Sequence, residues 1–152
     1  MKAKIIVTTL VVGILAFLAE PNGPAGVFWR PSPMVPEAVG VQLPLFMFLG
    51  MAEALVFGFG IAFLIFGASM VGQFKVSPGL ARASHLSISW VMINWWAHDS
   101  LHLHNGMELS GLLKIEYGFH ITLMLAGIIL ARFFVAMAQV SIAIRPQHAA
   151  SV

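Results

Sequence analysis

The sequence predicts an all-α integral membrane protein, an antiparallel bundle of four transmembrane helices with both termini in the cytoplasm. Of the 152 residues, 59% are hydrophobic and only 9% are charged, whereas soluble domains contain roughly 25% charged residues. Four apolar stretches approach or exceed the length that a helix needs to cross the hydrocarbon. The Lys and Arg residues are shared unequally between the connecting loops, and this inequality sets the orientation of a membrane protein.

The same composition excludes several classes of protein. A chain with a mean hydropathy of +0.91 neither dissolves as an ordinary globule nor stays disordered in water. The absence of cysteine excludes a disulfide-stapled fold, thiolate metal sites and Fe–S clusters. The eight Lys and Arg residues are spread singly along the chain, so we expect the lipid bilayer, and not nucleic acid, as a partner.

The first predicted span covers about residues 5–19 and follows Lys2 and Lys4. It is short and shares its basic start with secretory signal peptides. Cleavage after Ala19 would place Phe17 where such sites carry a small residue, so we expect the segment to be retained as an anchor. The alternative topology has three spans, with residues 1–19 removed.

Three further spans are predicted at about residues 43–74, 81–104 and 112–144. The second is interrupted by a single charge, Glu53, and short turns that contain Pro or Gly separate it from the third and the third from the fourth. Short connections favour antiparallel neighbours, so residues 1–152 are expected to form one domain.

The positive residues predict the orientation of these spans. In a four-span layout, only Arg30 and Lys114 lie on the side opposite the termini. Because the side richer in Lys and Arg is cytoplasmic, both termini are predicted to be cytoplasmic, in a multi-pass protein of a bacterial or archaeal inner membrane. The six residues on the side of the termini are Lys2, Lys4, Lys75, Arg82, Arg132 and Arg145.

The residues best suited to bind a metal or transfer protons lie near the predicted outer end of the third span. Asn94, His98 and His102 are spaced four apart, which places them on one face of a helix. Asp99 adjoins His98, so its carboxylate is predicted either to bind a metal beside His102 or to orient an imidazole. His104 falls on a different face and is the weakest candidate of the group.

The fourth span supplies a second polar set at the same depth. Glu116 and His120 are four residues apart and share a face. A short hairpin joins the two spans on the outer side, so we expect both sets to meet there. Glu53, about ten residues into the second span, is costly in lipid and is expected to face the bundle and a polar partner, with His98 or His120 the partner that we name.

Imidazole and carboxylate groups together favour Cu, Zn or non-haem Fe. We predict His98, His102 and His120 as cofactor ligands, with Asp99 as a fourth metal ligand or an orienting group. A haem between the third span and His120 fits the same residues, and a pigment needs only one of them. Proton transfer and a hydrogen-bonded hairpin without a cofactor remain open alternatives. The supporting residues are Glu53, Asn94 and Glu116.

A chain of this size leaves little mass outside the membrane for recognising a substrate. We therefore expect a subunit of a larger membrane complex or a homo-oligomer. The preferred interpretation is a membrane oxidoreductase subunit whose polar site binds a transition metal or haem for redox chemistry. The alternative is a non-catalytic structural or pigment-binding subunit of a respiratory, photosynthetic or monooxygenase assembly. A transporter ranks last, because the inner halves of the spans carry few polar residues.

Overall fold

The computed structural model describes residues 1–20, 23–26, 32–35 and 38–149, with side chains as far as Val140. All regular structure in this part of the chain is helical, as predicted. The elements are α1 (Lys2–Ala19), α2 (Gln42–Phe66), α3 (Ala68–Val71), α4 (Pro78–Asn105) and α5 (Leu109–Ala149).

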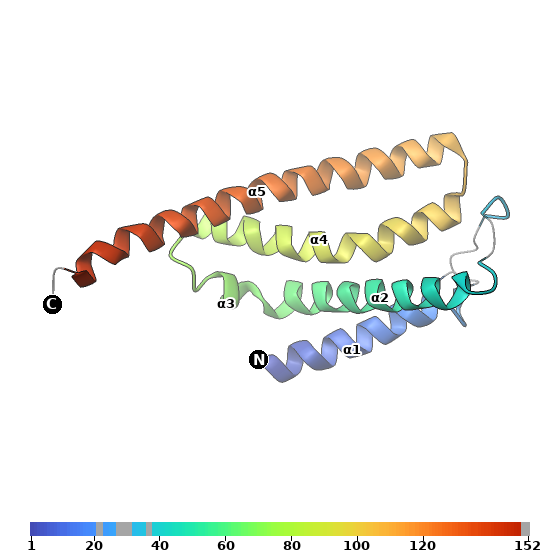
Figure 1. Cartoon of the computed structure of the whole chain (residues 1–152), viewed down its shortest axis with the longest axis horizontal. Helices are drawn as coiled ribbons and strands as arrows, with labels where there is room; N and C mark the ends of the chain where they lie inside the picture. Colours follow the sequence, from blue (N-terminus) through green and yellow to red (C-terminus); the bar gives the residue numbers. More distant parts are fainter. Residues whose placement is uncertain (21–22, 27–31, 36–37, 150–152) are drawn as a thin grey trace.

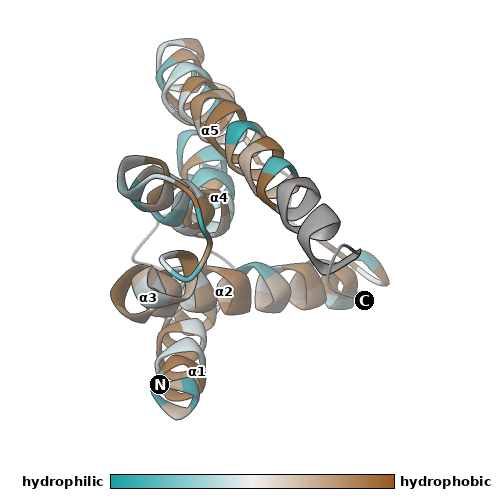
Figure 2. Ribbon diagram, turned by 90° about the vertical axis from the view of Figure 1, so that its left-hand side faces the viewer, coloured by the Kyte–Doolittle hydropathy of each residue, from teal (hydrophilic) through white to brown (hydrophobic). Residues whose placement is uncertain are grey.

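The four long helices alternate in direction and lie in a row (Figure 1). Among the described residues, α1 packs on α2, α2 on α4 and α4 on α5, each helix along its neighbour in the chain. The view along the long axis of the molecule shows α1 and α5 at the two edges of the row (Figure 2). We call the end with the α4–α5 turn the hairpin end, and the end where α1 and α4 begin the opposite end.

In the part of the chain that the structure describes, three helices are long and apolar enough to cross a membrane: α1, α2 and the Leu109–Val140 part of α5. Helix α4 has the length of a span, about 42 Å at 1.5 Å per residue, but it is too polar to be counted with them. Its position between α2 and α5 explains how it tolerates this composition, because the neighbouring helices cover its polar residues. The buried polar residues of α4 are Ser84, His85, Ser87, Ser89, Asn94 and Ser100.

The predicted second span, residues 43–74, is not one continuous helix. Helix α2 ends at Phe66, and Gly67 separates it from the single turn of α3. A Cβ at Gly67 would lie 2.6 Å from the ring of Phe63, so the close approach at this bend requires glycine. His85, near the start of α4, is buried and donates from Nε2 to the Phe63 carbonyl oxygen at 2.9 Å.

Helices α1 and α2 approach closely through small residues. A Cβ at Gly58 would lie 2.7 Å from the backbone N of Gly13, so a larger residue would force the two backbones apart. Farther toward the hairpin end, Ala16 of α1, Ala54 of α2 and Trp96 of α4 form one buried cluster. This packing joins three helices beside the polar residues of α4.

Candidate metal centre

The turn between α4 and α5 fixes the position of the polar residues at the hairpin end. Gly106 ends α4 with φ of +60°, a conformation that favours glycine. Glu108 then accepts hydrogen bonds from the backbone N–H of Ser110 at 3.0 Å and of Gly111 at 2.7 Å. The hydrogen bond from the Ser110 hydroxyl is the main cause that lowers the pKa of Glu108, and these two backbone hydrogen bonds lower it further. The carboxylate thus stabilises the start of α5.

Aromatic contacts set the register of α5 against α4. Trp90 Nε1 donates to Thr122 Oγ1 at 3.0 Å, and the rings of Trp90 and Phe119 stack with centroids 5.8 Å apart. Phe119 also meets the edge of the His98 ring, with centroids 5.2 Å apart. In this antiparallel register, His102 lies opposite Glu116 across the helix pair.

Three side chains from the two helices converge near the hairpin end. His98 Nε2 and His102 Nε2 are 3.1 Å apart, and His102 Nε2 lies 3.2 Å from Glu116 Oε1. Each of the three residues offers one atom that can bind a metal, and each of these atoms lies within 4.8 Å of the other two. Ligands at 2.0–2.1 Å from a tetrahedral ion are separated by about 3.3 Å, so these atoms need only small shifts to share one metal ion.

Two further residues hold the converging groups in place. Asp99 Oδ1 lies 3.1 Å from His98 Nδ1, which favours the tautomer that leaves His98 Nε2 able to bind a metal. His120 Nδ1 lies 2.7 Å from Glu116 Oε2, so the second oxygen of Glu116 is held while Oε1 faces His102. Carboxylate–imidazole pairs of this kind orient ligands in metal sites.

A buried carboxyl group of α2 lies near the candidate site. Glu53 on α2 is only 5% exposed, and its Oε1 has no hydrogen-bond partner among the described residues. The carboxyl groups of Asp99 and Glu20 lie close enough to interact with it, and Glu20 packs against Gly50. Carboxyl groups this close repel one another when charged, and protons or cations offset that repulsion most where a group such as Glu53 is buried.

The predicted site residues take different positions. His98 and His102 lie in contact on one face of α4, and Glu116, which the sequence placed in a supporting role, provides the third converging atom. His120 contacts Glu116, with its ring centroid 5.4 Å from that of His98. Asp99 and Glu20 interact with Glu53 in this structure, and a pairing of Glu53 with His98 or His120 stays a prediction. Metal binding by any of these residues stays a prediction.

Asn94 shares the predicted helix face but not the same contacts. Its side-chain amide donates to the carbonyl oxygens of Trp90 at 2.9 Å and Val91 at 3.0 Å within α4. Such bonds satisfy a buried polar group inside a helix. Asn94 therefore serves the helix itself in this structure.

No protein-family model, curated protein or solved structure matches this chain.

Proposed function

We propose that this protein binds one first-row transition metal ion at the hairpin end through His98, His102 and Glu116. The observation that carries the proposal is the convergence of two imidazole nitrogens and one carboxylate oxygen within 4.8 Å. These groups are intermediate in exposure: 20% of the His98 side chain, 29% of His102 and 41% of Glu116 are accessible. An ion bound there would keep a coordination position open to water or a small substrate.

The ligand set narrows the choice of metal. Two His and one carboxylate with open positions are typical of non-haem Fe(II) sites, and the same set binds Zn²⁺ in hydrolytic enzymes. The ring centroid of His98 lies 4.4 Å from that of His102 and 5.4 Å from that of His120. This spacing favours a single ion over a haem held between His98 and His120. We propose iron, with redox chemistry as the function, and rank Zn and Cu after it.

The neighbouring carboxyl groups have proposed roles in the same chemistry. Asp99 orients His98, and His120 orients Glu116, so loss of either weakens binding without removing a ligand. Glu53 lies next to Asp99, which contacts His98. This sequence of contacts supports proton exchange between the membrane interior and the metal site, with Glu53 as the inner group.

The proposed setting is a four-span subunit of a larger membrane complex, with α4 as the additional span and both termini cytoplasmic. The hairpin end then faces outward. The two edge helices of the row each have one long-helix neighbour and expose large apolar residues, such as Ile14 on α1 and Leu125 on α5. In a membrane, lipid or another subunit covers such apolar faces.

The competing function is that of a non-catalytic structural or pigment-binding subunit in a respiratory, photosynthetic or monooxygenase assembly. The open row of helices favours this alternative, because a row with two apolar edges fits between other membrane subunits. In that case the His and Glu residues would serve only the hairpin's own hydrogen bonds.

Metal content distinguishes the two functions. We would purify the protein in mild detergent, load it anaerobically with Fe(II), Zn²⁺ or Cu²⁺, and measure the retained metal by plasma mass spectrometry. One ion per chain is expected for the wild type, with near-complete loss in His98→Ala and Glu116→Gln. The matched controls, His148→Ala and Glu108→Gln, should retain it. Equal metal content in all variants would overturn the site.

A second measurement tests the redox part. The iron-loaded protein should show a reversible change in its electron paramagnetic resonance spectrum on oxidation and reduction. Stoichiometric zinc with no retained iron would overturn redox chemistry but leave the metal site.

A further inference from the structure

The end opposite the hairpin is positively charged and has no acidic residue to balance it. All acidic residues of the chain lie at or between positions 20 and 116, with none in 54–98. The residues around the start of α1, the α3–α4 turn and the last third of α5 therefore include Lys and Arg but neither Asp nor Glu. No Asp or Glu side chain of these segments can therefore serve as a counter-ion for the cations.

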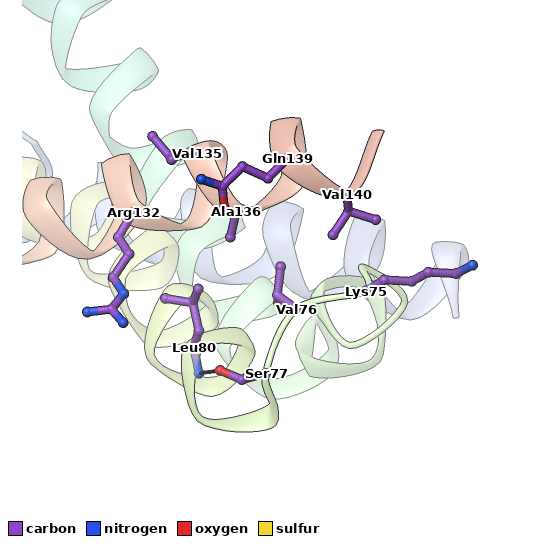
Figure 3. Close-up of a pocket in the computed structure, with 9 residues that line it drawn as sticks. All are labelled: Lys75, Val76, Ser77, Leu80, Arg132, Val135, Ala136, Gln139 and Val140. Atoms are coloured by element: carbon purple, nitrogen blue, oxygen red, sulfur yellow. Dashed lines mark hydrogen bonds between the residues drawn. The ribbon is translucent and has the colours of Figure 1, made fainter. Parts of the chain in front are cut away.

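Two of these cations flank an open groove with a volume of about 630 Å³. It lies between the α3–α4 turn and α5, with Arg132 at one end and Lys75 at the other (Figure 3). Its walls between the two charges are mainly apolar and include Val76, Leu80, Val135 and Val140. The groove therefore combines separated positive charges with a surface that fits hydrocarbon.

The groove lies at the depth of lipid headgroups. Arg132 is about 35 Å along α5 from Leu109 at 1.5 Å per residue, slightly more than the roughly 30 Å of a hydrocarbon core. Lys75 lies in the turn before α4, at the same end of the molecule. Both side chains are exposed, so each can reach an anionic group at the interface.

We propose that this groove binds an anionic phospholipid. The headgroup phosphate contacts Arg132 and Lys75, and an acyl chain lies against the apolar walls. Basic pockets between transmembrane helices bind anionic headgroups for this reason. A free phosphate would use the charges but leave the apolar walls without a partner, so the lipid fits the whole groove. The site lies at the opposite end from the metal centre, so it stands or falls independently of the metal proposal.

Native mass spectrometry of the full chain in mild detergent tests the proposal. The probes are phosphatidylglycerol and phosphatidylcholine with identical acyl chains. We expect the wild type to retain phosphatidylglycerol about tenfold more than phosphatidylcholine, and the double variant Lys75→Gln/Arg132→Gln to lose this preference. The matched control is Lys2→Gln/Lys4→Gln, which removes the same charge at the same end outside the groove and should keep it.

Further variants separate the possible outcomes. Arg132→Lys keeps the positive charge and should keep the preference for phosphatidylglycerol. This variant therefore still tests the role of the charge if the double variant folds poorly. Val135→Asn should weaken phosphatidylglycerol binding while leaving the charges in place. If the Lys2→Gln/Lys4→Gln control lost the preference for phosphatidylglycerol equally, the lipid site in the groove would be overturned. General attraction between the positive end and anionic lipid would then explain the preference. Displacement of the lipid by millimolar inorganic phosphate, with no effect of Val135→Asn, would show a phosphate site and overturn the lipid.

Discussion

The two ends of the α4–α5 pair differ in how their charges are balanced. At the hairpin end, acidic and imidazole side chains contact one another at 2.7–3.2 Å. At the opposite end, Lys75 and Arg132 flank a groove in a region without any acidic residue. The hairpin end therefore brings three candidate metal ligands together within one chain, whereas the cations of the opposite end have no Asp or Glu beside them. The following predictions test this contrast.

The largest expected effect is the loss of metal binding in Glu116→Gln. The amide keeps the shape of the side chain but removes the negative charge and the carboxylate ligand, so affinity should fall at least about 100-fold. Isothermal titration with the preferred metal measures the change. Lipid binding at the opposite end should stay unchanged. A variant that binds metal as the wild type does would show that His98 and His102 act without Glu116.

Asp99→Asn should have a smaller effect at the same end. Asparagine still reaches His98 Nδ1 but no longer strengthens its partner by charge, so metal affinity should fall roughly 10- to 100-fold with the stoichiometry retained. Competition with a chelator of known affinity provides the measurement. Complete loss of the ion would instead make Asp99 a direct ligand, as the sequence also allowed.

Arg132→Glu should reverse the behaviour of the opposite end. The new carboxylate repels an anionic headgroup, so the preference for phosphatidylglycerol over phosphatidylcholine should fall about tenfold or more. Native mass spectrometry detects this change, and metal content serves as the internal control. Loss of both properties together would indicate general misfolding and would be recognised by a lowered melting temperature.

Glu108→Gln should have the smallest effect. Because the pKa of Glu108 is lowered in the folded protein, its contribution to stability is present above the unfolded pKa and is lost as pH falls through the folded value. The wild type should therefore lose thermal stability on acidification from about pH 6 to about pH 3 more steeply than the variant. Melting curves across this range make the comparison. Parallel curves would show that the carboxylate at the start of α5 adds no stability.

The helical fold was predictable because its signals are local. The apolar stretches of α1, α2 and α5 indicate transmembrane helices by composition alone, and the Ser77–Pro78 start of α4 matches a capped helix, with Leu80 N donating to Ser77 Oγ at 3.3 Å. The break at Gly67 was missed, because the surrounding residues are as apolar as those of a continuous span. The partner of His85 could not be inferred from the sequence for a related reason, since it is a backbone carbonyl on another helix.

The candidate site was predictable in part. The spacing of His98 and His102 places them on one face of α4 in any helix, and Glu116 with His120 likewise on α5. Which of these four would face each other was open, because sequence spacing says nothing about the register between two helices. The contacts of Phe119 with Trp90 and His98 supply that register and bring Glu116, in preference to His120, to His102.

Composition and helical periodicity alone account for the all-helical fold, the apolar spans and the accumulation of His, Asp and Glu near one end, because each depends on residues close together in the chain. The partners of Glu53, His85 and Glu116 follow only from the tertiary structure. Each pairing joins different helices, and its geometry depends on how small residues and aromatic rings let those helices approach. The same holds for the groove at Arg132, since a groove exists only where two elements meet.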